Sequence, residues 1–164
     1  MVATTVQLHE VTRSIEKSLL ALEVSEDQKA FIAPIEQSAK LAASVDHFQI
    51  AILADEVVVG YALYFTTLDR AGKIPQQLKD SASRYTEIVR FLVDRHFQRR
   101  GIGTVALGML VDHIRATHGA TKIWMSYRKR NTASGKLFRK VGFRDTDVQE
   151  EQEFVLVLET GPKP

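Results

Sequence analysis

The sequence predicts a single mixed α/β domain, in which helices flank a central, mostly antiparallel sheet. The chain has 164 residues, of which 45% are hydrophobic and 26% charged, as in one globular domain with its own core. Segments 48–52 and 57–65 have the composition of a β-hairpin, and segment 85–127 has the pattern strand, helix, strand. We expect residues 1–160 to form the domain and residues 161–164 to be a frayed tail.

The N-terminal third shows one strand signal and three helix signals. Apolar residues in segment 6–11 alternate in part, which predicts a strand, and segment 15–22 has helical spacing. Two further helical segments, 26–31 and 36–43, flank Pro34, which disfavours helix at the residue before it. We therefore expect a helical region with a break between the first strand and the hairpin.

The remaining elements follow a polar segment, 66–83, which we expect to be a functional or mobile loop. A strand, a helix, a strand, a helix and a closing strand are expected at 85–93, 104–118, 122–127, 131–141 and 154–158. Gly142 is well placed to cap the C-terminus of the last helix.

Composition excludes several classes of protein. The chain has no cysteine, which excludes disulfides, thiolate zinc sites and a cysteine nucleophile, and it has no apolar run of about 18 residues. We expect a cytoplasmic protein that is neither secreted nor embedded in a membrane. The five histidines lack metal-like spacing, so we expect no metal site and place these side chains at the surface.

Charge gives one local signal. The net charge of +2 is too small to predict nucleic-acid binding by itself. Segment 128–140, however, contains six cations and no acid, a pattern that a solvated helix face also produces.

The segment that indicates chemistry is the junction between strand 85–93 and the helix after it, with the sequence Gln98-Arg99-Arg100-Gly101-Ile102-Gly103-Thr104. A helix N-terminus offers unpaired N–H groups and partial positive charge, so it suits an anion. The two glycines allow a tight turn and close approach of a ligand, Thr104 could cap the helix, and the arginines add charge. We expect a pyrophosphate here.

The pattern Gln98-x-x-Gly101-x-Gly103 after an apolar strand resembles the acetyl-CoA pyrophosphate loop of the GNAT superfamily. The run from Asn131 to Gly142-Phe143 is similar to the second GNAT signature, and the order of elements resembles that fold over nearly the whole chain. The resemblance implies a GNAT-like sheet that is splayed between its fourth and fifth strands, where the strands containing Phe91 and Met125 part to admit the cofactor.

The resemblance further implies an acetyl-CoA-dependent N-acetyltransferase that uses direct attack in a ternary complex. The backbone of the strand before the loop would pair with the pantetheine arm, the amides of the loop would hold the pyrophosphate, and Asn131 would face the CoA arm. The residues expected to bind acetyl-CoA are Phe91, Leu92, Val93, Gln98, Arg99, Arg100, Gly101, Ile102, Gly103, Thr104, Asn131 and Phe138.

Transfer to an amine needs a base that frees the lone pair and often an acid for the leaving thiolate. Glu87 is the candidate base, because its spacing from Gln98 resembles that of the catalytic strand glutamate in histone-type GNAT enzymes. Many members of the family have a tyrosine as the general acid where this chain has Phe138. Tyr127 is the candidate substitute, and water or unassisted departure of the thiolate are the alternatives.

The acceptor is expected to be a small-molecule primary amine. Val24-Ser25-x-x-Gln28-x-x-Phe31-Ile32-Ala33 resembles the start of the diamine and spermine/spermidine acetyltransferase branch. Ile35 and the cationic segment 128–130 depart from that branch and disfavour a polyamine.

Several alternatives remain at this point. The acceptor could be a protein N-terminus, a lysine, an amino acid or an aminoglycoside, or the chain could be a CoA-binding sensor without catalysis. RNA binding through segment 128–140 would require an affinity that falls steeply with salt. Segment 65–85 could cover the acceptor site or contact a second subunit, so a homodimer is also an alternative.

Overall fold

The computed structural model describes residues 3–29, 35–43, 47–67, 75–78 and 84–160. The strands are β1 (Val6–Glu10), β2 (His47–Ala54), β3 (Val57–Thr67), β4 (Tyr85–Val93), β5 (Lys122–Arg128), β6 (Arg144–Gln149) and β7 (Glu153–Glu159). The α-helices are α1 (Arg13–Leu20), α2 (Glu26–Lys29), α3 (Ile35–Leu41), α4 (Ile102–His118) and α5 (Thr132–Val141). Two short 3₁₀ turns, η1 (Gln76–Leu78) and η2 (Arg95–Phe97), precede and follow β4.

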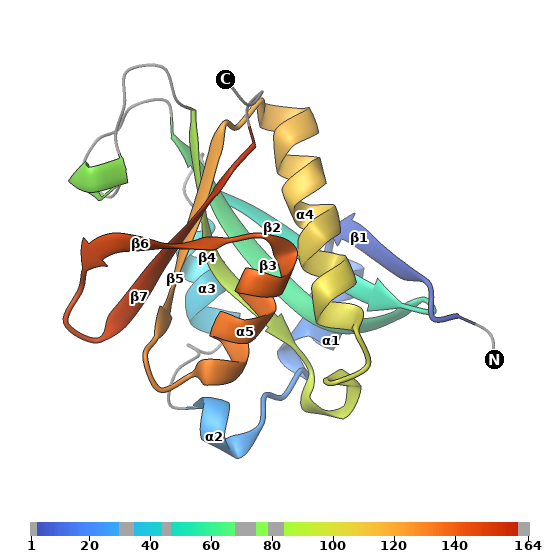
Figure 1. Ribbon diagram of the computed structural model, residues 1–164. Coiled ribbons are helices and arrows are strands. Elements are labelled where there is room, and N and C mark those ends of the chain that lie inside the picture. Colours follow the sequence, from blue (N-terminus) through green and yellow to red (C-terminus); the bar gives the residue numbers. More distant parts are fainter. Residues whose placement is uncertain (1–2, 30–34, 44–46, 68–74, 79–83, 161–164) are drawn as a thin grey trace.

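All seven strands form one sheet in the order β1-β2-β3-β4-β5-β7-β6 (Figure 1). Every neighbouring pair is antiparallel except β4 and β5, which are parallel. The parallel pair is connected through α4, as a parallel connection requires. This mostly antiparallel mixed α/β architecture confirms the predicted fold class.

The predicted hairpin is formed by β2 and β3, which pair from His47 with Phe65 to Ala54 with Val57. Asp55 and Glu56 form its two-residue turn, and both have positive φ, at 48° and 68°. Two successive residues with positive φ are the mark of a type I′ turn, whose twist matches that of the flanking strands.

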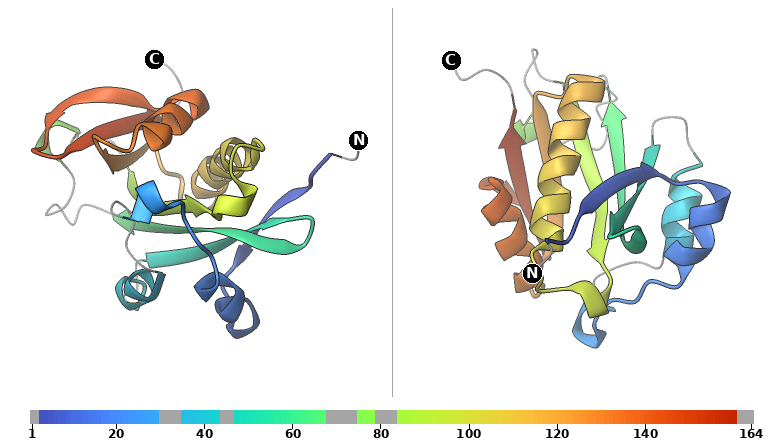
Figure 2. Two further views of the ribbon diagram at one scale, coloured as in Figure 1. Left: turned by 90° about the horizontal axis from the view of Figure 1, so that it is seen from below. Right: turned by 90° about the vertical axis from the view of Figure 1, so that its right-hand side faces the viewer.

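Helices cover both faces of the sheet (Figure 2). One face packs against α4 and α5 through the largest buried cluster, which includes Tyr64 and Ile88 from the sheet and Leu107 and Leu110 from α4. The other face packs against α1 and α3 through a second cluster around Leu63. Burial of these apolar side chains on two faces contributes most of the stability of such a domain.

The sheet divides between β4 and β5. These strands pair over three positions, from Tyr85 with Lys122 to Glu87 with Trp124, and pairing stops there. Beyond Glu87, β4 continues to Val93 beside β3, whereas β5 continues to Arg128 beside β7. The predicted splay between the fourth and fifth strands is therefore present.

The structure differs from the sequence expectations at two elements, β6 and α4. No strand was expected at β6, but residues Arg144–Gln149 pair with β7 at the edge of the sheet. Helix α4 begins at Ile102 with Gly101 as its N-cap, so Thr104 lies inside the first turn and does not cap it. Residues 30–34, which hold the expected break at Pro34, and the tail 161–164 lie outside the described residues.

Among the described residues, no helix is both long and apolar enough to cross a membrane.

Candidate functional site

A cavity of about 600 Å³ lies beyond the point where β4 and β5 separate. The C-terminal end of β4, the turn into α4, the first turn of α4, one side of α5 and segment 24–28 form its walls. Its lining residues are Val24, Ser25, Asp27, Gln28, Phe91, Leu92, Val93, Arg95, Gln98, Arg99, Gly101, Gly103, Thr104, Ala133, Ser134, Leu137, Phe138 and Lys140.

The N-terminus of α4 is built to receive a ligand. Gly101 has a φ of 80° and, as N-cap, offers no side-chain hydrogen bond to the first-turn N–H groups of the helix. Arg99, two residues earlier, also has positive φ, at 59°, which turns the chain sharply before the helix. Gly103 faces the cavity residues Leu137 and Val93, so a glycine keeps this part of the cavity open.

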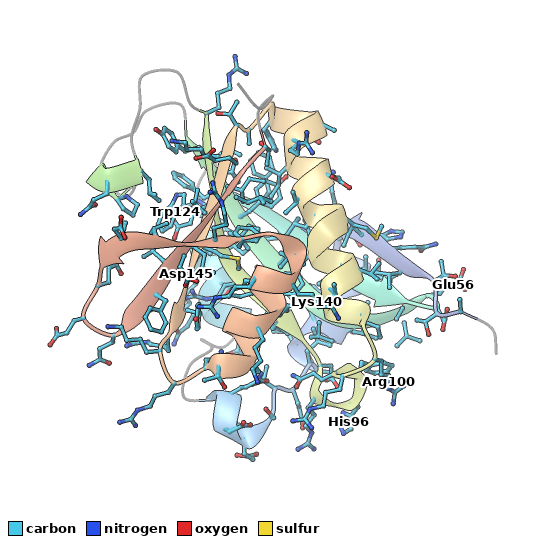
Figure 3. The ribbon with its side chains drawn as sticks, in the orientation of Figure 1. Glu56, His96, Arg100, Trp124, Lys140 and Asp145 are labelled. Carbon is cyan, nitrogen blue, oxygen red and sulfur yellow. The ribbon has the colours of Figure 1, made fainter. Side chains whose placement is uncertain are left out.

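Nine of the twelve residues that we expected to bind acetyl-CoA line this cavity, and three do not. The guanidinium of Arg100 lies 5.4 Å from the centre of the Phe97 ring, and Ile102 is buried in the core. Asn131 is the N-cap of α5, where its Oδ1 accepts a hydrogen bond from the Ser134 N–H at 3.4 Å. Figure 3 shows His96 and Arg100 on the turn between β4 and α4, and Lys140 on α5.

The two candidate catalytic residues do not line the cavity within the described part of the chain. Glu87 lies on β4 at the last position that pairs with β5, where the sheet divides. Tyr127 is buried on β5, and its ring packs edge to face against Phe138 with centroids 5.9 Å apart. Its hydroxyl accepts a hydrogen bond from Arg139 on α5. Phe138 lines the cavity, so Tyr127 lies behind the Phe138 ring.

Segment 24–28 is a wall that the site prediction missed, although the sequence motif at Val24, Ser25 and Gln28 offered a signal. Glu23, the residue immediately before this segment, is bound to the turn after β4. The Asp94 carboxylate accepts hydrogen bonds from the Glu23 N–H at 2.8 Å and from the His96 N–H at 2.9 Å. The Arg95 N–H donates to the Glu23 carbonyl at 2.7 Å, and the side chains of Arg95 and Glu23 form an ion pair at 2.9 Å.

Asp94 remains ionised in this buried position. Burial by itself raises the pKa of its carboxyl group, but the N–H groups of Glu23 and His96, together with the His96 side chain, stabilise the carboxylate. The net effect lowers the pKa of Asp94 below its ordinary value. The carboxylate therefore connects the wall and the turn with charge-assisted hydrogen bonds.

The cations of segment 128–140 do not act as one patch. Arg128 lies 3.5 Å from Glu153, and the Lys129 ammonium lies over the Phe154 ring, so both contact β7. Arg139 pairs with Asp145 at 2.7 Å. Lys140, in contrast, lines the cavity.

Three of the five histidines, including His47 on β2, are half-buried and so depart from the expected surface positions. His113 and His118 are half-buried, and the Nε2 atoms of both lie within hydrogen-bonding distance of the Tyr64 hydroxyl, at 3.3 and 3.1 Å. The two residues are five positions apart on α4, and the Tyr64 hydroxyl on β3 lies within reach of both. Among the described residues, no group of three histidine or acidic side chains could hold a metal ion.

Residues 12–143 match the family model described as "Acetyltransferase (GNAT) family". A probable spermine N(1)-acetyltransferase of Bacillus subtilis subsp. natto is 23% identical over 140 residues, which cover 85% of this chain and 88% of that protein.

Two other similar proteins have different acceptors in their names. The [ribosomal protein bS18]-alanine N-acetyltransferase of Salmonella typhimurium is 25% identical over 103 residues, covering 63% of this chain and 59% of that protein. The structure of AAC(6')-Ib in complex with paromomycin and acetyl-CoA superposes with a TM-score of 0.75 at 15% identity, covering 94% of this chain and 93% of that one. At this identity the structural likeness shows the fold alone.

Proposed function

Since the chain belongs to the GNAT acetyltransferase family, we propose that it transfers an acetyl group from acetyl-CoA to a primary amine of a small molecule. The observation that carries this proposal is the cavity at the division of the sheet, which ends at the uncapped N-terminus of α4. An amine could attack the acetyl group directly in a ternary complex, with no covalent enzyme intermediate.

The residues present fit acetyl-CoA. The first-turn N–H groups of α4 and the nearby Arg99 and Lys140 would bind its phosphates, because helix N-termini and cations both stabilise anions. The β4 backbone at 91–93 borders the cavity where no β5 strand pairs with it, so its N–H and C=O groups would bind the pantetheine arm. Acetyl-CoA would supply the acetyl group as a thioester.

Glu87 is the proposed general base. It lies at the division of the sheet, on the strand that leads into the cavity. A carboxylate at this point would accept a proton from the ammonium form of the acceptor, either directly or through one water molecule.

Tyr127 is the proposed general acid, with unassisted departure of the thiolate as the alternative. Its hydroxyl lies against α5 between Gly135 and Arg139, behind Phe138. A proton from Tyr127 would therefore have to reach the thiolate past the Phe138 ring, or through water. A CoA-like thiol has a pKa of roughly 8.5, so it can also leave as the anion.

Polyamines are the first acceptors to test, because the natto relative is named a probable spermine N(1)-acetyltransferase. One observation favours a less cationic acceptor. Among the described charged residues that line the cavity, three are cationic (Arg95, Arg99 and Lys140) and one, Asp27, is acidic. A peptide N-terminus, as in the name of the Salmonella relative, or an amino acid is therefore the second candidate.

The test is release of free CoA thiol from acetyl-CoA by the purified protein, with spermine, spermidine, short diamines, amino acids and an alanine-terminated peptide as acceptors. Glu87→Gln should lower kcat on the active acceptor by roughly 10²–10⁴-fold. Glu10→Gln, which alters an exposed strand glutamate on β1, should leave kcat unchanged. CoA binding without turnover on any amine would instead support a CoA-binding sensor and refute the role of Glu87.

A further inference from the structure

A chain of hydrogen bonds connects the end of β4 to segment 24–28 through two glutamine side chains. The Gln98 Nε2 donates to the Val93 carbonyl at 2.8 Å and to the Gln28 Oε1 at 2.9 Å. Both glutamines are half-buried, and both line the cavity.

This chain fixes the orientation of both carboxamides. The Val93 carbonyl can only accept a hydrogen bond, so the amide group that faces it must be the NH₂ of Gln98. The second N–H of that NH₂ group points to Gln28, which must therefore present its oxygen. With its Oε1 engaged, Gln28 has its own NH₂ group left to donate.

The surrounding contacts hold Gln28 in this place. The Gln28 N–H donates to the Ser25 carbonyl at 2.9 Å, and Glu23, which immediately precedes segment 24–28, is attached to the turn after β4 by its hydrogen bond to Asp94 and its ion pair with Arg95. Gln98 therefore orients the carboxamide of Gln28, and the contacts of Glu23 fix the start of the segment that carries Gln28. A donor that is oriented before a ligand arrives loses little side-chain entropy on binding.

The ligand group that suits this donor is a neutral carbonyl oxygen. A protonated amine cannot accept a hydrogen bond from N–H groups, so the acceptor in its ammonium form does not match. Asp27 lines the same wall, and its negative charge disfavours a phosphate there. The cations Arg99 and Lys140 lie on the α4 and α5 sides of the cavity, where a phosphate is favoured.

We propose that Gln28 is a further binding residue, which donates from its Nε2 to an amide carbonyl of the pantetheine arm, and that Gln98 is the positioning residue that orients it. The inference rests on the proposed function, because it requires acetyl-CoA in this cavity. It assigns segment 24–28 a direct role in recognising the cofactor.

The experiment measures binding of CoA, and of adenosine 3′,5′-bisphosphate as a fragment without the pantetheine arm, by calorimetry. Gln28→Met keeps the length of the side chain and removes the donor, so CoA should bind roughly tenfold more weakly, the value of one hydrogen bond. The fragment should bind Gln28→Met as tightly as it binds the unaltered protein. Gln37→Met, on the exposed side of α3, is the matched control and should change neither affinity.

Gln98→Met tests the orienting role. Alone, Gln98→Met should weaken CoA binding. Combined with Gln28→Met, it should cause little further loss of CoA affinity, because Gln98 acts through Gln28. Unchanged CoA affinity in Gln28→Met, or an equal loss for CoA and for the fragment, would overturn the inference. If the unaltered protein binds no CoA at all, the proposed function itself fails.

Discussion

Gly135 on α5 lies directly against the Tyr127 side chain. A Cβ atom built on Gly135 would lie 2.5 Å from Tyr127 Cζ and would also contact the hydroxyl oxygen. No real Cβ atom approaches a carbon so closely, so an alanine here would push α5 and β5 apart. Absence of a side chain at Gly135 thus allows Tyr127 to pack behind Phe138.

We predict that Gly135→Ala lowers the free energy of unfolding by about 1–3 kcal/mol, the usual cost of overpacking a core. Gly108→Ala is the control, because Gly108 is also in a helix and a Cβ there would meet nothing within 4 Å. It should raise the free energy of unfolding by about 0.5–1 kcal/mol through helix propensity alone. Urea unfolding would check that Gly135→Ala lowers the free energy of unfolding and that Gly108→Ala raises it.

Gly103→Ala should separate stability from ligand binding. Its Cβ would lie 3.5 Å from a Leu137 methyl group and 3.6 Å from a Val93 methyl group, which are ordinary contacts. We therefore expect the free energy of unfolding of Gly103→Ala to lie within about 0.5 kcal/mol of that of the unaltered protein. The added methyl group fills space in the cavity, so CoA affinity should fall at least roughly tenfold by calorimetry. An unaltered affinity would place the pyrophosphate elsewhere.

Asp94 should make the fold sensitive to acid. Its pKa is lowered in the folded state, so its stabilising effect is fully present above the unfolded value of about 3.9 and is lost as the pH falls through the lower folded value. Asp94→Asn should flatten the decline in stability below about pH 4. Asp112→Asn, on the exposed side of α4, should leave that decline as it is. Thermal unfolding between pH 2.5 and 7 measures both slopes.

The Tyr64, His113 and His118 cluster predicts a second pH dependence. Burial, and then the charge of His113, lower the pKa of His118, while burial raises the pKa of Tyr64 to about 12. Because the unfolded state binds the His118 proton more readily, stability is fully present above about pH 6.5 and falls as the pH drops below it. The Phe48 ring also packs on His118, and the negative charge of Glu10 contributes to raising the pKa of Tyr64.

His118→Asn should therefore reduce the loss of stability between pH 7.5 and pH 5.5, measured by urea unfolding. His9→Asn, which changes an exposed histidine on β1, should retain the full loss. Equal losses in both variants would show that the cluster does not titrate in this range.

The strong local signals predicted the fold well. Alternating apolar residues identified β2, a run of β-branched and aromatic residues identified β3, and the glycine-rich junction after β4 identified the start of α4 to within two residues. The edge strand β6 was missed because five of the six residues of Arg144–Gln149 are polar, and its pairing with β7 gives it strand structure that its own composition does not indicate.

The sequence by itself determined the order of the elements other than β6, the family resemblance and nine of the residues that line the cavity. Tertiary structure alone decided which distant groups meet: the Gln28 and Gln98 side chains, the Glu23 N–H and the Asp94 carboxylate, and the Tyr64 hydroxyl and both histidines of α4. The reason is physical. Propensity and spacing act between neighbours along the chain, whereas these hydrogen bonds join residues separated by about fifty to seventy positions, which only the packed sheet brings together.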